Sequence, residues 1–186
     1  MPCDWRAIEN ALSSWVRTAS GLDTAHVYFG DQNGPQPATG VFITIRLGDI
    51  VPLGAYDSID FSNQNLGAPN GTEIELRTFA PRSFTVSLQC FSAVTVTPGA
   101  VPATGKDILG KVQNALGLES VRYALNAAGL VPYDIGTVQN VSALLETAFE
   151  GRANLDVLFY TTDDISEFVG YINQLTPSTA PTGTYS

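Results

Sequence analysis

The side chains best suited to catalysis are few in this sequence. There is one histidine, His26, which begins a short apolar segment and is far along the chain from any serine or cysteine with the pattern of a nucleophile. A catalytic triad needs a nucleophile, a base and an orienting acid held together. The pattern favours a histidine on the outer face of a strand, and a hydrolase that uses His26 is the catalytic alternative.

The cysteines and acidic residues give no clear metal or cofactor site. Cys3 and Cys90 form no CxxC pair and have no histidines at metal-ligand spacing, so we expect free thiols. The stretch Asp31-Gln32-Asn33-Gly34 begins like a calcium loop, but the later acidic ligands do not follow. Asp163 and Asp164 are adjacent acids of the kind that face water at the end of a strand. We therefore expect neither an enzyme, nor a cofactor, nor a bound metal.

Composition excludes some classes of partner and favours self-association. The 186 residues include 9 basic and 18 acidic side chains, a net charge of −9, which argues against gripping the phosphates of nucleic acid. Only 15% of residues are charged, against about 25% in ordinary soluble domains, so the chain has apolar surface to bury in an assembly. No apolar run is long enough to cross a membrane, and the first residues do not resemble a signal peptide. We expect a soluble protein that is first present in the cytoplasm and has no membrane partner.

The first half of the chain predicts a helix followed by two hairpins. Apolar residues recur at helical spacing from Asp4 to Ser20, with Gly21 as the stop. Strands at 26–29 and 41–47 are expected to form a hairpin. Its loop, with Asp31, Asn33, Gly34, Pro35 and Pro37, is too long for a two-residue turn. Residues 48–71 are expected to be a long projecting loop. Two further alternating strands are expected to turn at Ala80-Pro81-Arg82.

The second half predicts helices and then strands. Thr104 followed by Asp107 resembles a capping box, and a second helical piece runs over 120–128 before Gly129. Strands are expected over 138–145 and from Ala153 onward. Near the end of the chain, Ile165, Phe168, Val169 and Ile172 fit a helix, while 170–175 could equally be an edge strand. We expect one α+β domain over 1–175, mostly antiparallel with helices on one face, and a flexible tail over 176–186.

Arg152 is the one basic residue singled out as a possible contact. It follows Gly151, which we expect to form a turn, and Glu150 lies on the other side of that glycine. The guanidinium could bind a carboxylate of a neighbouring subunit in bidentate fashion. The alternative is a local pair between Arg152 and Glu150, worth under about 1 kcal/mol if exposed.

Several stretches together resemble the neck or tail terminator proteins of long-tailed bacteriophages. They are, in chain order, DWRAIENALSSWVRTASGL, VYFGDQNGPQPATGVFITIRL, RSFTVSLQCFS and FEGRANLDVLFYTTDDISEFVGYI. The order and spacing of these stretches carry the resemblance, which covers most of 4–175. Two features depart from the family pattern: Ala38-Thr39-Gly40 stands where a Pro-Tyr pair is common, and the loop over 48–71 is long.

The resemblance implies a non-enzymatic virion protein that forms a ring, usually a homohexamer. Such a ring ends tail-tube polymerisation and offers a surface to the head connector, so the implied partners are further copies, a tail tube or sheath protein and a connector or adaptor. Genomic DNA would pass through an acidic lumen without specific binding. The contacts would involve Arg152 with Glu150, the turn from Gln32 to Pro37, and the loop 48–71.

A second class of function remains open beside this one. The chain could be a monomeric binding module of a phage or contractile-injection assembly, or a carbohydrate-binding β-rich domain. An aromatic pocket would then use Tyr28, Phe42 and Phe91, which fall on outward strand faces.

Overall fold

The structure is a computed structural model, and it describes residues 4–30, 40–54, 58–64, 74–93, 104–141, 143–145 and 148–169. Side chains are described over the same ranges apart from 58–64, 74–75, 93, 143–145, 148–150 and 168–169. Predictions for the turn at 32–37, Cys3 and the tail at 176–186 fall outside these ranges.

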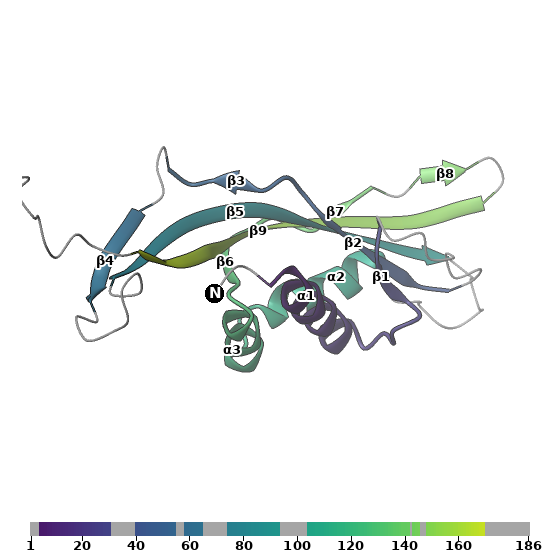
Figure 1. The fold of residues 1–186 in the computed structure, drawn as a ribbon. Helices are drawn as coiled ribbons and strands as arrows, with labels where there is room; N and C mark the ends of the chain where they lie inside the picture. The colour runs from purple at the N-terminus through teal and green to yellow at the C-terminus, as the bar shows by residue number, and fades with distance from the viewer. Residues whose placement is uncertain are drawn as a thin grey trace, which may run out of the picture.

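Two very long strands organise the sheet. Strand β5 (Ile74–Ala93) has 20 residues and pairs along its whole length, antiparallel, with the 22-residue β9 (Ala148–Val169). At about 3.4 Å per residue, such a pair extends over roughly 65 Å, far beyond the 5 or 6 residues of an average strand. Figure 1 shows this pair running from one end of the molecule to the other.

Shorter strands flank the long pair on both sides, in the order β1-β2-β5-β9-β6. These are β1 (Val27–Phe29), β2 (Phe42–Leu47) and β6 (Val131–Ile135). Strands β3 (Val51–Pro52) and β4 (Ser58–Gln64) also pair with β5, and β7 (Gln139–Asn140) and β8 (Ala143–Leu145) also pair with β9. The sheet is mixed, because β1 and β2 are parallel while the other pairings of the described chain are antiparallel.

Three helices lie on the same side of the sheet in Figure 1: α1 (Trp5–Ser20), α2 (Gly105–Ala115) and α3 (Glu119–Ala127). Asp4 caps α1 by accepting hydrogen bonds from the Arg6 and Ala7 amides at 3.0 and 3.1 Å, and Gly21 ends it with φ 74°. Thr104 and Asp107 form the predicted capping box of α2. The sequence-based predictions of these helices are confirmed, as is the α+β class.

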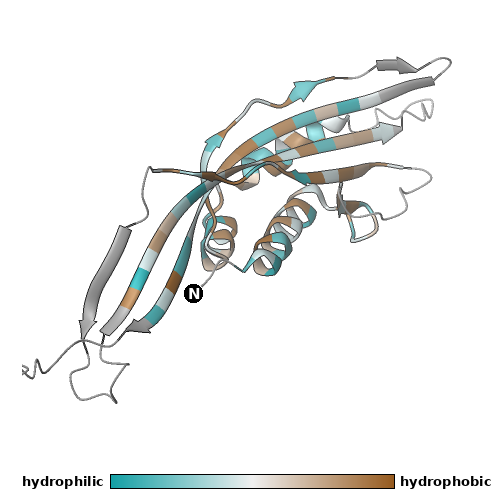
Figure 2. Ribbon diagram, turned by 45° about the horizontal axis from the view of Figure 1, so that its top comes forward, coloured by the Kyte–Doolittle hydropathy of each residue, from teal (hydrophilic) through white to brown (hydrophobic). Residues whose placement is uncertain are grey.

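The core lies between the helices and the middle of the long strand pair. Buried and part-exposed residues alternate from Phe84 to Cys90 on β5 and from Ala153 to Phe159 on β9. Figure 2 shows the same alternation of apolar and polar residues along the two strands. Trp15 of α1 meets the Phe159 ring edge-on at 6.0 Å, and its indole N–H donates to the Val112 carbonyl oxygen at 3.2 Å. We call the side of the sheet that carries Phe84 and Phe159 the helix face, and the other side the open face.

The first predicted hairpin is wrong. Strands β1 and β2 run parallel, with Val27 opposite Ile43 and Phe29 opposite Ile45. A hairpin turn joins only antiparallel strands, whereas parallel neighbours need a connection of about a dozen residues that brings the chain back. Residues 30–41 supply that length, so the same Gly and Pro pattern that suggested a turn belongs to a crossover connection.

The second predicted hairpin is also wrong, because β5 continues through Ala80-Pro81-Arg82 without turning. The carbonyl oxygen of Pro81 accepts a hydrogen bond from the Leu53 amide at 3.0 Å. The N–H and C=O of one strand residue point to the same side, so the N–H that Pro81 lacks would also point toward β3. Strand β3 has just ended there, at Pro52. Proline is therefore tolerated inside a long strand at this position.

Other predicted loops and strands also differ from those in the structure. The segment 48–71 is not a plain loop, because it contains β3 and β4, both paired with β5. The strand expected over 138–145 is divided into β7 and β8, and β6 was not predicted. The helix considered from Ile165 is wrong as far as Val169, because these residues belong to β9. The edge strand considered over 170–175 lies outside the described residues. The extent of the single domain over 1–175 stays a prediction.

Candidate functional site

Arg152 lies inside a strand and not beside a turn. Gly151 pairs with Ser92 across the β5–β9 ladder, so the predicted turn at this glycine is wrong. The Ser92 hydroxyl donates to the Gly151 carbonyl oxygen at 3.2 Å, and a β-carbon at position 151 would collide with the Ser92 Oγ. Glycine at this position leaves room for the Ser92 hydroxyl and keeps the Ser92 backbone oxygen free of a tight contact. The backbone of Glu150 lies opposite Ala93, and its side chain lies outside the described ones.

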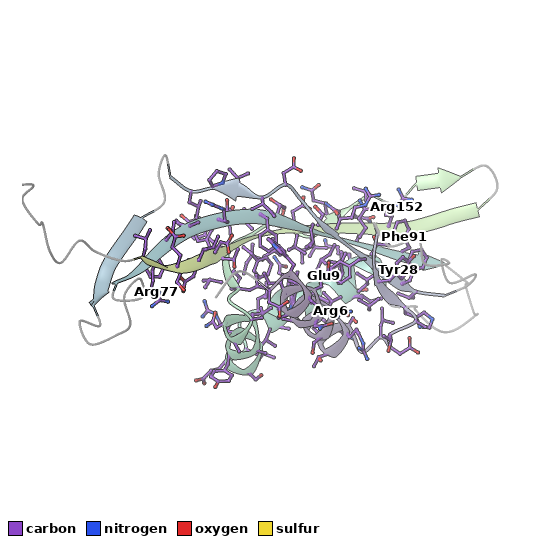
Figure 3. The ribbon with its side chains drawn as sticks, in the orientation of Figure 1. Arg6, Glu9, Tyr28, Arg77, Phe91 and Arg152 are labelled. Atoms are coloured by element: carbon purple, nitrogen blue, oxygen red, sulfur yellow. The ribbon has the colours of Figure 1, made fainter. Side chains whose placement is uncertain are left out.

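The Arg152 side chain rests on an aromatic ring of the neighbouring strand. Its guanidinium carbon is 4.5 Å from the centre of the Phe91 ring, and Arg152 and Phe91 are direct partners in the ladder. Guanidinium groups are attracted to the negative face of an aromatic ring, with energies of about 0.5–1 kcal/mol when exposed and about 2 when desolvated. Figure 3 shows Arg152 and Phe91 near the same part of the sheet, far from Arg77.

The stack continues across two further strands. Phe42 of β2 is opposite Phe91 and stacks on it with ring centres 4.6 Å apart and planes 14° apart. Tyr28 of β1 stacks on Phe42 at 5.9 Å and 21°. These four half-buried side chains, Tyr28, Phe42, Phe91 and Arg152, form what we call the aromatic ladder. It crosses four adjacent strands on the open face, since each member alternates with a residue of the helix face.

The structure therefore joins two sets of residues that the sequence presented separately. Arg152 was predicted as a subunit contact, and Tyr28, Phe42 and Phe91 as an alternative aromatic pocket. They form one continuous surface of stacked rings that ends in a guanidinium. Burial raises the pKa of the Tyr28 hydroxyl, which fits a ring packed against its neighbours. Such a surface can bind a partner by stacking and by a guanidinium contact.

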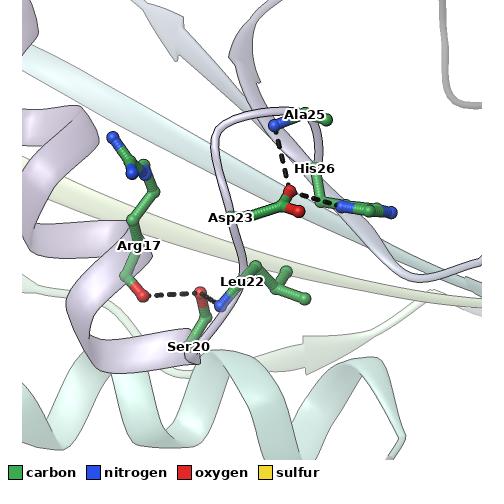
Figure 4. Close-up of polar contacts among 6 residues, drawn as sticks. All are labelled: Arg17, Ser20, Leu22, Asp23, Ala25 and His26. Atoms are coloured by element: carbon green, nitrogen blue, oxygen red, sulfur yellow. Dashed lines mark hydrogen bonds and ion pairs between the residues drawn. The ribbon is translucent and has the colours of Figure 1, made fainter.

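His26 lies apart from the ladder, in the link between α1 and β1 (Figure 4). Its Nδ1 is 2.6 Å from Asp23 Oδ1, and this hydrogen bond lowers the pKa of the Asp23 carboxyl. The same carboxylate accepts from the Ala25 amide at 3.0 Å. Among the hydrogen bonds of the described residues, the His26 ring is bonded to Asp23 and to no hydroxyl or thiol. This geometry explains the histidine as part of a turn.

Cys90 is a buried thiol on the helix face of β5. Burial raises its pKa to about 12, so it is protonated at neutral pH. A nucleophilic cysteine needs a lowered pKa and some exposure. The environment of Cys90 therefore matches a packing role.

The paired acids at 163 and 164 are also placed by the sheet. Asp164 Oδ2 is 2.6 Å from Arg77 Nη2 on the neighbouring strand, and this bond lowers the pKa of the Asp164 carboxyl. Arg77 also lies over the Phe79 ring, 5.2 Å from its centre. Sequence reasoning missed this pair, because its two members come together only through the register of β5 and β9.

A second interaction that sequence reasoning missed involves β6. Tyr133 of this strand stacks on Tyr160 of β9 with ring centres 4.4 Å apart. Burial and the hydrogen bond to Tyr133 raise the pKa of Tyr160. The alternation Val131, Tyr133, Ile135 was the signal that could have indicated the strand.

The described ranges contain no group of three His, Cys, Asp or Glu residues placed to hold a metal ion. Within the same ranges, no helix has both the length and the apolar character needed to cross a membrane.

Comparison with known proteins gives three results. No curated protein matched the sequence. Nineteen chains of solved structures matched, among them the sheath/tube terminator of an extracellular contractile injection system, PVC, in its extended state, studied by cryo-EM. That match has 13% identity and a TM-score of 0.46, and it covers 100% of this chain and 66% of that chain. The family described as phage neck terminator protein matches residues 6–184, which is nearly the whole sequence, and this protein therefore belongs to the phage neck terminator family.

Proposed function

We propose that this protein forms a ring at the head-proximal end of a phage tail, ends tail-tube assembly there, and joins the tail to the head connector. The observation that carries the proposal is the match of residues 6–184 to the phage neck terminator family. The ring is a homohexamer, and its other partners are a tail tube or sheath protein and a head connector or adaptor. The protein acts as a structural part of the virion, assembled in the host cytoplasm, and not as an enzyme.

The shape of the sheet supports an assembly role. Residues 76–79 of β5 and 162–167 of β9 have no fully buried side chain, and Figure 1 shows this end of the pair extending past the helices. Strand β4 adds a third strand along β5 here, but no described helix covers this end in Figure 1, so side-chain burial inside one subunit stabilises it little. We call these residues the arm, and in the ring it contacts a neighbouring subunit or the tail.

The charge of the chain supports a passage for DNA. A net charge of −9 repels the phosphate backbone, and a ring of six such chains concentrates this charge around its axis. DNA can then move through the lumen without being held. Genomic DNA is therefore a partner that passes through the ring and is not bound specifically.

The contact residues that we propose begin with the aromatic ladder. Arg152, with Glu150 two residues before it in β9, lies at one end of the ladder, where a guanidinium can bind a carboxylate of the next subunit. The turn residues Gln32, Asn33, Gly34, Pro35 and Pro37 stay in the proposal as a second contact.

The first experiment is to measure the solution mass together with an assay of tube capping. Six copies of the 19.8 kDa chain give about 119 kDa, with ring-shaped particles in negative stain. Assembled tail tubes are then incubated with the protein and challenged with fresh tube protein, and tube lengths are measured. The proposal predicts tubes that no longer grow. Tubes that grow as fast as untreated ones, together with a monomer that does not bind them, would overturn it and favour a monomeric binding module.

The role of Arg152 is tested by Arg152→Ala beside the matched control Arg46→Ala, which removes an exposed arginine from the same face of the sheet. We expect Arg152→Ala to shift the ring toward monomer at equal concentration, while circular dichroism shows an unchanged fold. Arg46→Ala should leave the ring intact. An unchanged oligomer mass for Arg152→Ala would exclude Arg152 as a contact.

A further inference from the structure

The surface between α1 and α3 contains an apolar hollow of about 280 Å³. Small and apolar side chains from both helices line it, chiefly Ala11, Trp15, Val121, Ala124 and Leu125. A cavity of roughly 150 Å³ is large enough for benzene, so this hollow has room for one aromatic side chain. Ordinary helix packing would fill such a space with larger residues.

The guanidinium of Arg17 lies beside this hollow. A second, more polar hollow of about 370 Å³ adjoins it through Ser14 and Thr18, which line both, and is itself lined by Arg17. Arg17 Nε is buried, and it has no hydrogen-bond partner within the described part of the chain. In Figure 4 the Arg17 guanidinium points away from the Asp23 and His26 pair. We call the two adjoining hollows together the groove. It offers an apolar space followed by a positive charge.

The same protein carries a surface of complementary chemistry. Tyr123 of α3 is 76% exposed, the most exposed large hydrophobic side chain of the described residues. Glu119 lies four residues before it, so the carboxylate and the phenol ring are neighbours on one face of the helix. Tyr123 does not line the groove, and it lies about 100° around the helix from Ala124, which does.

We propose that the groove between α1 and α3 receives Tyr123 of a second copy of this chain, with Glu119 of that copy bound to Arg17. The inference rests on the proposed ring, because a head-to-tail contact needs two different surfaces on each subunit. The aromatic ring fills the apolar hollow and the carboxylate meets the guanidinium in the adjoining one. Tyrosine and arginine are the residue types that most often dominate the energetics of an interface.

The second copy is favoured over other occupants by its chemistry. The groove needs one aromatic group next to one negative charge, and Glu119 with Tyr123 present that pair on every copy. Each subunit then uses one side of α3 as a wall of its groove and another side as the inserted element. Such a contact repeats from subunit to subunit until the ring closes.

A charge exchange between Arg17 and Glu119 tests the contact. The variants Arg17→Glu and Glu119→Arg should each raise the concentration at which half of the protein is in rings by about tenfold or more, as expected for a desolvated charged pair. The double variant, Arg17→Glu with Glu119→Arg, should restore assembly toward that of the wild type. Arg6→Glu, on the same helix but outside the groove, changes the charge equally and should have no effect.

Two further variants test the aromatic part. Tyr123→Ala should weaken assembly by at least tenfold, whereas Tyr123→Phe, which keeps the ring, should assemble nearly as the wild type does. Thermal unfolding of each variant at a concentration where it is monomeric identifies any loss of fold.

The outcomes separate this inference from the proposed function. Wild-type rings that are unaffected by Tyr123→Ala, or single charge variants that the double variant does not rescue, would overturn the groove contact and leave the ring in place. A wild-type protein that neither forms rings nor caps tubes would overturn both. Binding of a tail tube protein that is lost in Tyr123→Ala, while the rings stay intact, would assign the groove to that partner and contradict the second copy.

Discussion

The middle and the arm of the β5–β9 pair belong to the same two strands but have different surroundings. In the middle, every second residue from Phe84 to Cys90 is buried under the helices. In the arm, Arg77 and Phe79 are only partly buried, and Ile165 is 57% exposed. The backbone ladder is equally continuous in both parts. Hydrogen bonding therefore sets the length of the strands, while side-chain burial decides which part of them stabilises the subunit.

The largest effect should come from truncating an aromatic residue in the middle. Phe159 is fully buried between Trp15 and Phe84, so Phe159→Ala should lower the free energy of unfolding by about 3–5 kcal/mol. Ile165→Ala changes the same face of β9 six residues later, in the arm, and should cost less than about 0.5 kcal/mol because the side chain is exposed. Denaturant unfolding of both variants measures the two values.

The milder variant Phe159→Leu keeps the comparison measurable if Phe159→Ala does not fold. It should still lose more stability than Ile165→Ala. Equal losses at the two positions would mean that the arm is as well packed as the middle, and would contradict the difference in burial between them.

The helices of this fold could be predicted because their signals are local. Asp4 and Gly21 mark the ends of α1, and Thr104 with Asp107 marks the start of α2, through contacts that span only a few residues. No distant part of the chain is needed to satisfy them. The sequence pattern therefore predicted the helix boundaries closely.

The strands could be predicted only in part, because distant pairing overrides local turn signals. Pro81 and Gly151 are residues that often end a strand, yet both lie within one here. Each is accommodated by a particular neighbour: Pro81 lies where β3 has ended, and Gly151 lies against Ser92. Those neighbours are fixed by the sheet order, which the spacing of residues does not reveal.

The candidate site follows the same rule. Arg152 could be selected from the sequence as an unusual basic residue, and Phe91 as an outward-facing aromatic one. Their contact depends on the register that places residue 91 opposite residue 152, far apart along the chain. The aromatic ladder could be recognised only when that register was known.

A smaller effect is expected from adding a methyl group at the strand glycine next to Arg152. Gly151→Ala should destabilise the protein by about 1–3 kcal/mol, because the new β-carbon must displace the Ser92 side chain and part of its backbone. Gly110 in α2 is the matched control, since a β-carbon there meets nothing within 4 Å. Gly110→Ala should stabilise the protein by about 0.5–1 kcal/mol through helix propensity.

Thermal unfolding should therefore move in opposite directions for the two alanine variants. The two variants compare a glycine that lies against a neighbouring side chain with one that has open space around it. A neutral result for Gly151→Ala would show that the Ser92 side chain moves aside at little cost, and that its hydrogen bond to Gly151 contributes little.

The smallest effect should be a pH dependence confined to the arm. The hydrogen bond from Arg77 lowers the pKa of Asp164 in the folded protein, so the carboxylate stabilises the arm above the unfolded pKa of about 3.9. A depressed folded pKa means that this stabilisation is present at neutral pH and is lost as the pH falls through the folded value. The pair is partly exposed, with 38% of the Arg77 side chain accessible, so solvent screens it and the effect stays local.

Hydrogen exchange at residues 76–79 can detect this local change, with protection factors corrected for the intrinsic pH dependence of exchange. Between pH 6 and pH 3 the wild type should lose protection there, while Asp164→Asn should be less protected already at pH 6 and change little. Residues 84–90 of the same strand are the internal reference, because their burial is apolar and carries no charge. If protection in the arm is insensitive to both pH and Asp164→Asn, the ion pair does not hold the arm, and its rigidity must come from the backbone ladder alone.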